Sequence, residues 1–102
     1  MNKAINITKL IAYQKDSIVS KELIKNPAGT VTVFAFDKKQ GLSDHKVSFD
    51  AIAYITEGNA KITISKKVHK VKEGEMIIMP ANKPHSVMAE SRFKMLLVMI
   101  RS

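Results

Sequence analysis

From residue 18 onward the chain is a succession of short β-branched and apolar runs separated by turn signals, and this rhythm restricts its fold more than any other feature. Strands are expected at 18–24, 30–36, 50–56, 60–65, 67–71, 75–80, 84–90 and 92–100. No apolar pattern of helical period and comparable length interrupts them. Regular short strands with frequent turn signals predict an all-β sandwich or barrel.

Glycine and proline mark the expected turns. Gly58, between the runs 50–56 and 60–65, predicts a tight hairpin at residues 57–59. The polar stretch 37–44 is expected to form a loop. Pro80 and Pro84 bracket a short stiff loop that leads into the strand beginning at His85.

The length of 102 residues predicts one domain, residues 1–102, with a single hydrophobic core. The barrel is expected at about 30–100, and the N-terminal arm, about 1–29, is a candidate for a dimer interface. The absence of cysteine excludes disulfides, thiolate catalysis and cysteine-ligated zinc. No stretch resembles a signal peptide or spans a bilayer, so we expect a cytoplasmic protein without membrane contact.

The 17 lysines and arginines exceed the 9 acidic residues and give a net charge of +8, which raises the alternative of nucleic-acid binding. Only Arg92 and Arg101 are arginines, the residues best suited to bidentate base and phosphate contacts. The lysines are spread along the chain rather than clustered. This distribution favours a solvated lysine surface that blunts strand edges over a nucleic-acid site.

Two segments resemble the cupin superfamily. In GEMIIMPANKPHSVMA, Gly74, Pro80 and His85 match the second cupin motif, whereas Asn82 and Ala89 replace its later glycine and its asparagine. In the first motif, counting back from Gly58 places His45 at the first histidine, Val47 at the second and Ala51 at the glutamate. The resemblance implies a single antiparallel jelly-roll barrel, the double-stranded β-helix.

The resemblance also bears on metal binding, because complete cupins hold iron, manganese, nickel or zinc with three histidines and a glutamate. Val47 and Ala51 have no lone pair to donate, which leaves His45 and His85 as the only ligands of the set. Asp50 or Asp44 would have to replace the missing carboxylate. We therefore expect no bound cofactor and a metal site that is lost or vestigial.

A small-molecule site in the barrel, with the ligand held by His45 and His85, is the function that we predict from these residues. Its expected lining is His45, His85, Val47, Ala51, Phe34, Phe36, Phe49 and Tyr54. One alternative is a metal-dependent dioxygenase or isomerase that uses His45, His85 and a rescuing carboxylate. Others are metal-free catalysis by a histidine and two buried histidines that serve structure alone, so whether the chain is an enzyme stays open.

The end of the chain indicates association with a partner. The run 92–100 is apolar on both strand faces, and such a strand is either sandwiched or covered by another chain. The run 18–24 could pair with the sheet edge of another subunit. We expect a two-fold homodimer.

Overall fold

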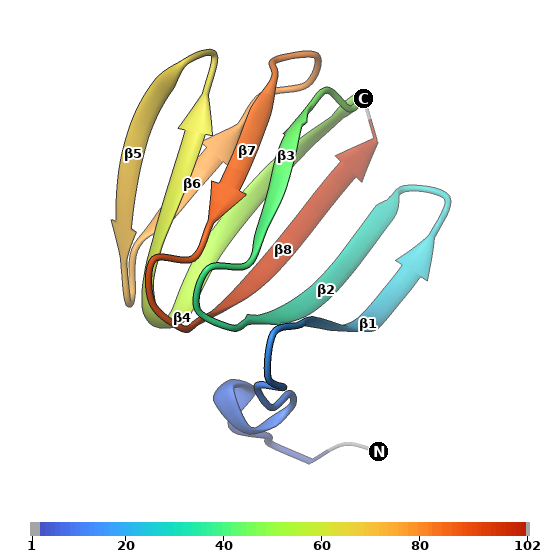
Figure 1. Cartoon of the computed structure of the whole chain (residues 1–102). Helices are drawn as coiled ribbons and strands as arrows, with labels where there is room; N and C mark the ends of the chain where they lie inside the picture. The colour runs from blue at the N-terminus through green and yellow to red at the C-terminus, as the bar shows by residue number, and fades with distance from the viewer. Residues whose placement is uncertain (1–2, 102) are drawn as a thin grey trace.

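The computed structural model describes residues 3–101, which form one curled antiparallel sheet (Figure 1). The sheet order is β1-β2-β8-β4-β7-β3, with β5 and β6 each paired to β4. The elements are η1 (Ile7–Lys9), β1 (Ile18–Asn26), β2 (Gly29–Phe36), β3 (Gly41–His45), β4 (Phe49–Ile64), β5 (Lys67–Lys72), β6 (Met76–Met79), β7 (His85–Met88) and β8 (Phe93–Arg101). The predicted all-β jelly-roll is confirmed. None of the helical structure within these residues is long and apolar enough to cross a membrane.

Strand β4 connects the two halves of the barrel. Its first part pairs with β6 and β8, and its second part pairs with β5 and β7. The hairpin predicted at residues 57–59 is wrong, because these residues continue β4 without a reversal. The register with β8 shifts between Ile55 and Glu57, which marks a β-bulge. Gly58 follows this bulge directly and has φ +76°, a conformation that glycine adopts readily. A Cβ at Gly58 would lie 2.4 Å from the carbonyl oxygen of Arg92.

Residues 41–45 correct a second expectation, since they form β3 within the stretch predicted as a polar loop. β3 lies at a free edge of the sheet and pairs with β7 alone. Four of its five residues are exposed, and they lack the apolar alternation that identifies a half-buried strand. Pairing with β7 therefore makes this segment a strand without a sign in its own sequence.

Alternating residues of β4 build the main core. Ala51, Ala53 and Ile55 are at most 3% exposed, and Ala60 and Ile62 continue the buried face beyond the bulge. Phe36 and Phe93 stack within this core with ring centroids 4.5 Å apart. Small residues on β4 leave room for larger side chains from the facing strands, as a tightly filled barrel interior requires.

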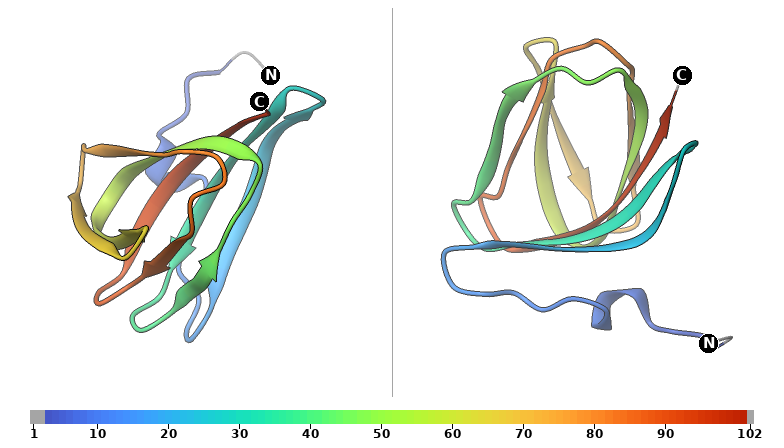
Figure 2. Two further views of the ribbon diagram at one scale, coloured as in Figure 1. Left: turned by 90° about the horizontal axis from the view of Figure 1, so that it is seen from above. Right: turned by 90° about the vertical axis from the view of Figure 1, so that its right-hand side faces the viewer.

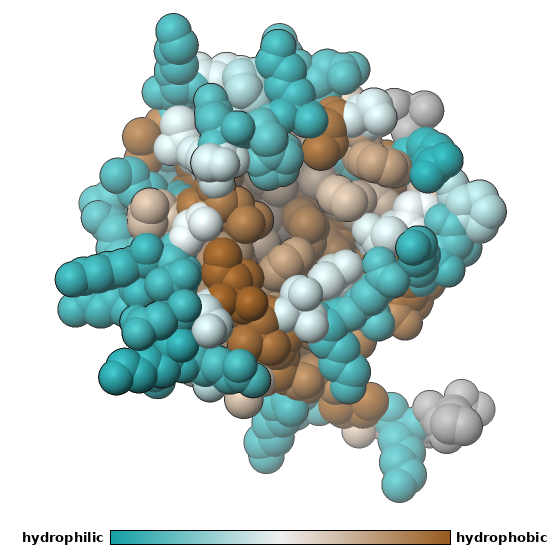
Figure 3. Space-filling view, turned by 45° about the vertical axis from the view of Figure 1, so that its right-hand side comes forward, coloured by the Kyte–Doolittle hydropathy of each residue, from teal (hydrophilic) through white to brown (hydrophobic). Residues whose placement is uncertain are grey.

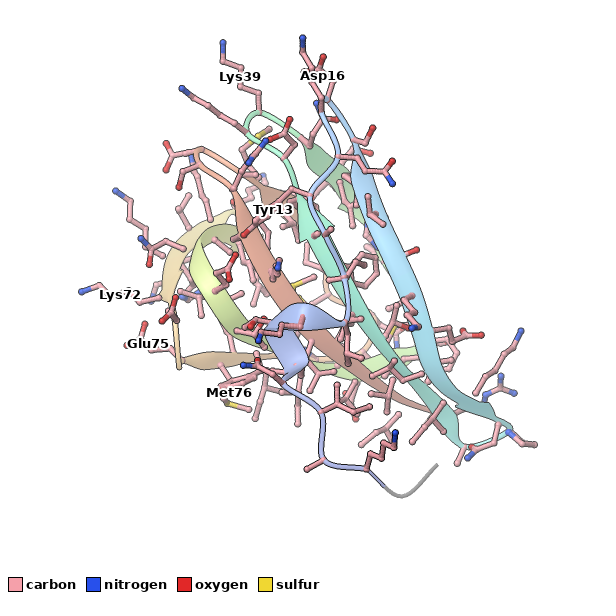
Figure 4. All side chains as sticks on the ribbon, turned by 90° about the horizontal axis from the view of Figure 1, so that it is seen from below. Tyr13, Asp16, Lys39, Lys72, Glu75 and Met76 are labelled. Atoms are coloured by element: carbon pink, nitrogen blue, oxygen red, sulfur yellow. The ribbon has the colours of Figure 1, made fainter. Side chains whose placement is uncertain are left out.

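The N-terminal arm, residues 3–17, covers part of the outer face of the sheet (Figure 2). Ile11 is 7% exposed and packs with Val33 and Ala35 of β2. Tyr13, labelled in Figure 4, donates its hydroxyl hydrogen bond to Glu57 at 2.6 Å. The Lys94 ammonium lies 5.0 Å from the centroid of the Tyr13 ring. The arm is therefore held by apolar packing, by the hydrogen bond to Glu57 and by this cation–π contact.

An apolar row crosses the outer face of the sheet beside the arm. The strand registers align its members directly across five strands, in the order Ile78, Ile52, Val98, Val31 and Ile24. None of them belongs to the cluster that packs with the arm. Ile78 is 58% exposed and Ile24 is 55% exposed, so both ends of this outer row face solvent.

The close approach at the β4 bulge predicts that alanine substitution costs more stability at Gly58 than at Gly74, although the two glycines have similar backbone conformations. Gly74 has φ +86°, but no atom lies within 4 Å of a Cβ placed there. We expect Gly74→Ala to lose about 1 kcal/mol of unfolding free energy through left-handed strain alone. Gly58→Ala adds the clash with the Arg92 carbonyl and is expected to lose about 3 kcal/mol. Urea unfolding of both variants measures the difference, and equal losses would contradict the close approach of β4 and β8.

Asp37, just after β2, links its own segment to the N-terminal arm and to the loop before β8. Its contacts predict a loss of stability in acid. Its carboxylate accepts hydrogen bonds from Arg92 Nε at 2.8 Å and from the backbone N–H of Asp16 at 2.7 Å. These bonds, chiefly the one from Arg92, lower the pKa of Asp37 to about 2. Because the pKa in the unfolded chain is about 3.9, this stabilisation is complete above about pH 4 and is lost as the pH falls toward 2.

The Asp37→Asn variant is therefore expected to be less stable near neutrality and to lose less stability than the parent between about pH 4 and 2. Urea midpoints measured across that range test the expectation. Asp44→Asn, at an exposed carboxyl on β3, is the control and should keep the acid loss of the parent. An unchanged pH profile in Asp37→Asn would refute the role of the carboxylate.

Candidate functional site

Two histidines meet where β3 pairs with β7. His45, the last residue of β3, lies opposite His85, the first residue of β7. Their ring centroids are 4.5 Å apart with an interplanar angle of 59°. His85 is 7% exposed, whereas His45 is exposed, so one ring lies inside the barrel and the other lies at its opening.

Loops at the same end of the barrel hold the pair in position. The backbone N–H of Asn82 donates to the carbonyl of Val47 at 2.8 Å and joins the loop before β7 to the loop after β3. The backbone N–H of Ser65 donates to the carbonyl of Pro84 at 2.9 Å. Asn82 has φ +65°, a conformation that asparagine tolerates better than most residues, and its turn directs the chain into His85.

Both rings line a small apolar cavity inside the barrel, with a volume of about 50 Å³. Figure 3 shows one face of the molecule with apolar surface near its middle and hydrophilic side chains around it. Other than the two imidazoles, every lining side chain is aliphatic or a methionine. The lining is Leu42, His45, Val47, Ala51, Met79, His85, Val87, Met95, Leu97 and Met99.

Four of the eight side chains predicted from the sequence lie together in this lining: His45, Val47, Ala51 and His85. The four aromatic residues lie elsewhere. Tyr54 is on the outer face of β4, 38% exposed, because strand alternation directs it away from Ala51. Phe36 is stacked in the core against Phe93. The ring centroids of Phe34 and Phe36 are 5.9 Å apart. Phe49 lies beneath the guanidinium of Arg101, whose Cζ is 5.4 Å from the centroid of the Phe49 ring.

The site residues predicted from the sequence did not include the three methionines that line this cavity, Met79, Met95 and Met99. Met79 of β6 and Met99 of β8 both lie opposite Ala51 across β4. Met95 and Leu97 share the inner face of β8 with Met99. The alternation of β8 was visible in the sequence, but the strands that flank Ala51 were not, because their order is set by the barrel.

The environment of His85 favours its neutral form. Burial lowers the pKa of His85 below its usual value, and the neighbouring His45 acts in the same direction. The Lys83 carbonyl and Asp44 oppose this shift. The imidazole inside the barrel is therefore neutral at pH 7 and is available as a hydrogen-bond acceptor.

A family model, the cupin domain, matches residues 32–101. This range includes both histidines and seven of the eight strands, in whole or in large part. The chain belongs to the cupin family. No protein with curated function matches it.

Solved structures agree with this assignment. A conserved protein of unknown function from Streptococcus pyogenes is 34% identical, with a TM-score of 0.96, and the match covers 100% of this chain and 90% of that one. A cupin 2 conserved barrel domain protein from Leptotrichia buccalis is 38% identical, with a TM-score of 0.93, over 95% of this chain and 47% of that one. A cupin superfamily protein from Desulfitobacterium hafniense shares the fold at 22% identity, with a TM-score of 0.95 and coverage of 100% and 94%.

The residues at the metal position of the family do not fit a divalent ion held by three histidines and a glutamate. Asp50, the first candidate for rescue, lies on the outer face of β4 and accepts a hydrogen bond from the backbone N–H of Ala81 at 2.8 Å. Asp44, the second candidate, is exposed on edge strand β3. Across residues 3–101, no three His, Cys, Asp or Glu side chains form a group that could hold a metal ion.

The lowered pKa of His85 predicts the pH dependence of its contribution to stability. Between its folded pKa and the unfolded value of about 6.5, the unfolded chain binds more protons than the folded chain. Stability from this group is therefore complete above about pH 6.5 and falls as the pH drops through the folded pKa. Imidazole NMR titration of His85 is expected to give a midpoint below 6.5, and a midpoint at or above 6.5 would contradict the burial argument.

Proposed function

We propose that this cupin binds a small molecule in its barrel, with His45 and His85 as the polar anchors. The observation that carries the proposal is the convergence of two imidazoles from paired strands on one apolar cavity. Ligand sites are commonly apolar cavities in which a few polar groups set the orientation of the ligand. Val47 and Ala51, which replace metal donors, contribute apolar wall to the same cavity.

The size of the cavity limits the ligand. A volume of about 50 Å³ corresponds to roughly three to five water positions, at about 10–15 Å³ for each water. Met79, Met95 and Met99 form part of the wall, and methionine is unbranched and adapts its rotamers readily. A ligand of a few non-hydrogen atoms suits the cavity as it stands, and larger ligands require the methionines to move.

The metal-dependent alternative lacks support from the donor set, since the two imidazoles have no carboxylate partner in the cavity lining. No residue of the lining is a lysine or arginine either, so the cavity and the basic surface are separate features. Nucleic-acid binding stays an untested alternative. A steep loss of binding with salt would identify it.

The methionine methyl groups provide a direct test of ligand binding. We expect small neutral amides and alcohols, screened by NMR, to shift the methyl signals of Met79, Met95 and Met99, which line the cavity. Met76 and Met88 are 47% and 44% exposed outside it and are internal controls whose signals should stay in place.

Substitution of the anchors completes this test. His45→Ala and His85→Ala are expected to weaken binding of any such probe about fivefold or more each, because each removes one hydrogen bond. His69→Ala, a change at the β5 histidine outside the cavity, is the matched control. Equal binding of the probe by all three variants would show that His45 and His85 do not anchor the ligand. Stoichiometric iron, manganese, nickel or zinc that is lost with the same substitutions would favour the metal-dependent alternative.

We further propose that the outer row, Ile78, Ile52, Val98, Val31 and Ile24, is the contact between two copies of the chain. The row carries no charge in a protein of net charge +8, so contact between two rows brings no lysine of one row against a lysine of the other. Edge strand β1 is a poorer contact, because its register shifts between Glu22 and Ile24 and it carries two lysines. The face is therefore favoured over strand addition at the edge.

A charge in the outer row tests this contact. We expect the parent to sediment at twice its chain mass of 11.4 kDa, and Ile78→Lys to weaken the dimer at least tenfold by leaving an unpaired charge in the interface. Val68→Lys, at a 49% exposed position on β5 outside the row, is the matched control and should leave the mass unchanged. A monomeric parent, or equal behaviour of the two variants, would refute the contact.

A further inference from the structure

The two histidines share a hydrogen-bonding arrangement that restricts the chemistry of the ligand. His45 Nδ1 lies 2.9 Å from the carbonyl oxygen of Ser43, and His85 Nδ1 lies 3.4 Å from the carbonyl oxygen of Lys83. In both cases the carbonyl belongs to the residue two positions earlier. A carbonyl oxygen only accepts hydrogen bonds, so in each neutral ring the proton is on Nδ1.

This tautomer determines what the other ring nitrogen can do. A neutral imidazole has one donor and one acceptor, so a proton on Nδ1 leaves Nε2 with a lone pair. Nδ1 is already used by the backbone in both rings. The histidine pair therefore has two free acceptors for a ligand and no free donor.

His85 stays neutral near pH 7 because of its surroundings. His85 is 7% exposed, and burial lowers its pKa. The ring centroids are only 4.5 Å apart, so protonation of both rings would place two positive charges side by side. The chain already has a net charge of +8, which adds to the cost of further positive charge.

The remaining lining supplies no side-chain donor. Leu42, Val47, Ala51, Val87 and Leu97 are aliphatic, and the sulfur atoms of the three methionines are at most weak acceptors. A carboxylate or phosphate would therefore present lone pairs to the two Nε2 lone pairs. A cation would find no carboxylate among the lining residues to balance its charge.

We propose that the ligand carries uncharged hydrogen-bond donors, hydroxyl or amide N–H groups, which donate to the Nε2 atoms of His45 and His85. The inference rests on the proposed function and narrows it to a ligand class. It also has a pH signature, because a protonated imidazole donates from both nitrogens. Anions therefore gain affinity as the pH falls below the histidine range, while uncharged donors lose it.

Acetamide and acetate are the matched probes, because they have nearly the same shape and size but only acetamide donates hydrogen bonds. Titrations at about pH 8 and about pH 5 fall on either side of the ordinary histidine pKa. At pH 8 we expect acetamide to bind at least about tenfold more tightly than acetate, since acetate leaves both acceptors unpaired. At pH 5 we expect the ratio to narrow or reverse.

Two independent readouts separate the inference from the function on which it rests. Imidazole ¹⁵N NMR of the free protein at pH 8 reports the tautomer directly, and a proton on Nε2 of His45 and His85 would overturn the inference. Acetate binding as tightly as acetamide at pH 8 would also overturn it, while leaving binding in the cavity intact. If neither probe shifts the Met79, Met95 and Met99 methyls at either pH, the proposed function itself fails.

Variants of the pair give the matched control. Glutamine offers both a donor and an acceptor, so His45→Gln and His85→Gln are each expected to reduce the preference for acetamide at pH 8 by about fivefold. His69→Gln should leave the preference unchanged, because His69 lies outside the cavity. Methyl spectra of each variant verify the fold, and an unchanged preference in folded variants would contradict the role of the two rings.

Discussion

The barrel depends on one strand that belongs to both of its halves. β4 has 16 residues, and its first part contributes to the sheet with β6 and β8 while its second part contributes to the sheet with β5 and β7. The change of direction occurs at Gly58, where the φ of +76° and the contact with the Arg92 carbonyl exclude a side chain. This bulge keeps Ala51 and Ile62 on the same buried side of the strand.

The cavity follows from that arrangement. Because Ala51 is small and lies between Met79 and Met99, β4 leaves space beneath the histidine pair instead of filling it. The same position would carry a metal-binding carboxylate in a complete cupin motif. With Ala51 at the glutamate position and Val47 at a histidine position, the site has neither the carboxylate charge nor the third imidazole that a divalent ion needs, and both side chains are apolar wall. Burial then keeps His85 neutral, which suits hydrogen bonding to an uncharged ligand.

Local sequence patterns are sufficient to predict some of the strands. The β-branched run 30–36 and the apolar run 92–100 are strands β2 and β8, because alternation and β propensity agree there. Gly58 was misassigned, because a glycine with positive φ is needed by a hairpin and by a bulge alike. Edge strand β3 has no local signature, since four of its five side chains face solvent.

The sequence alone determined the fold class, the family and the incomplete metal motif, because these follow from strand periodicity and from motif spacing along one chain. Motif spacing also placed His45 and His85 at histidine positions of the two cupin motifs. Only the tertiary structure decided that the two imidazoles pair across β3 and β7, that three methionines and not the predicted aromatic residues surround them, and that both Nδ1 atoms face carbonyls. Such contacts depend on strand order and register, which bring together residues that are far apart in the chain.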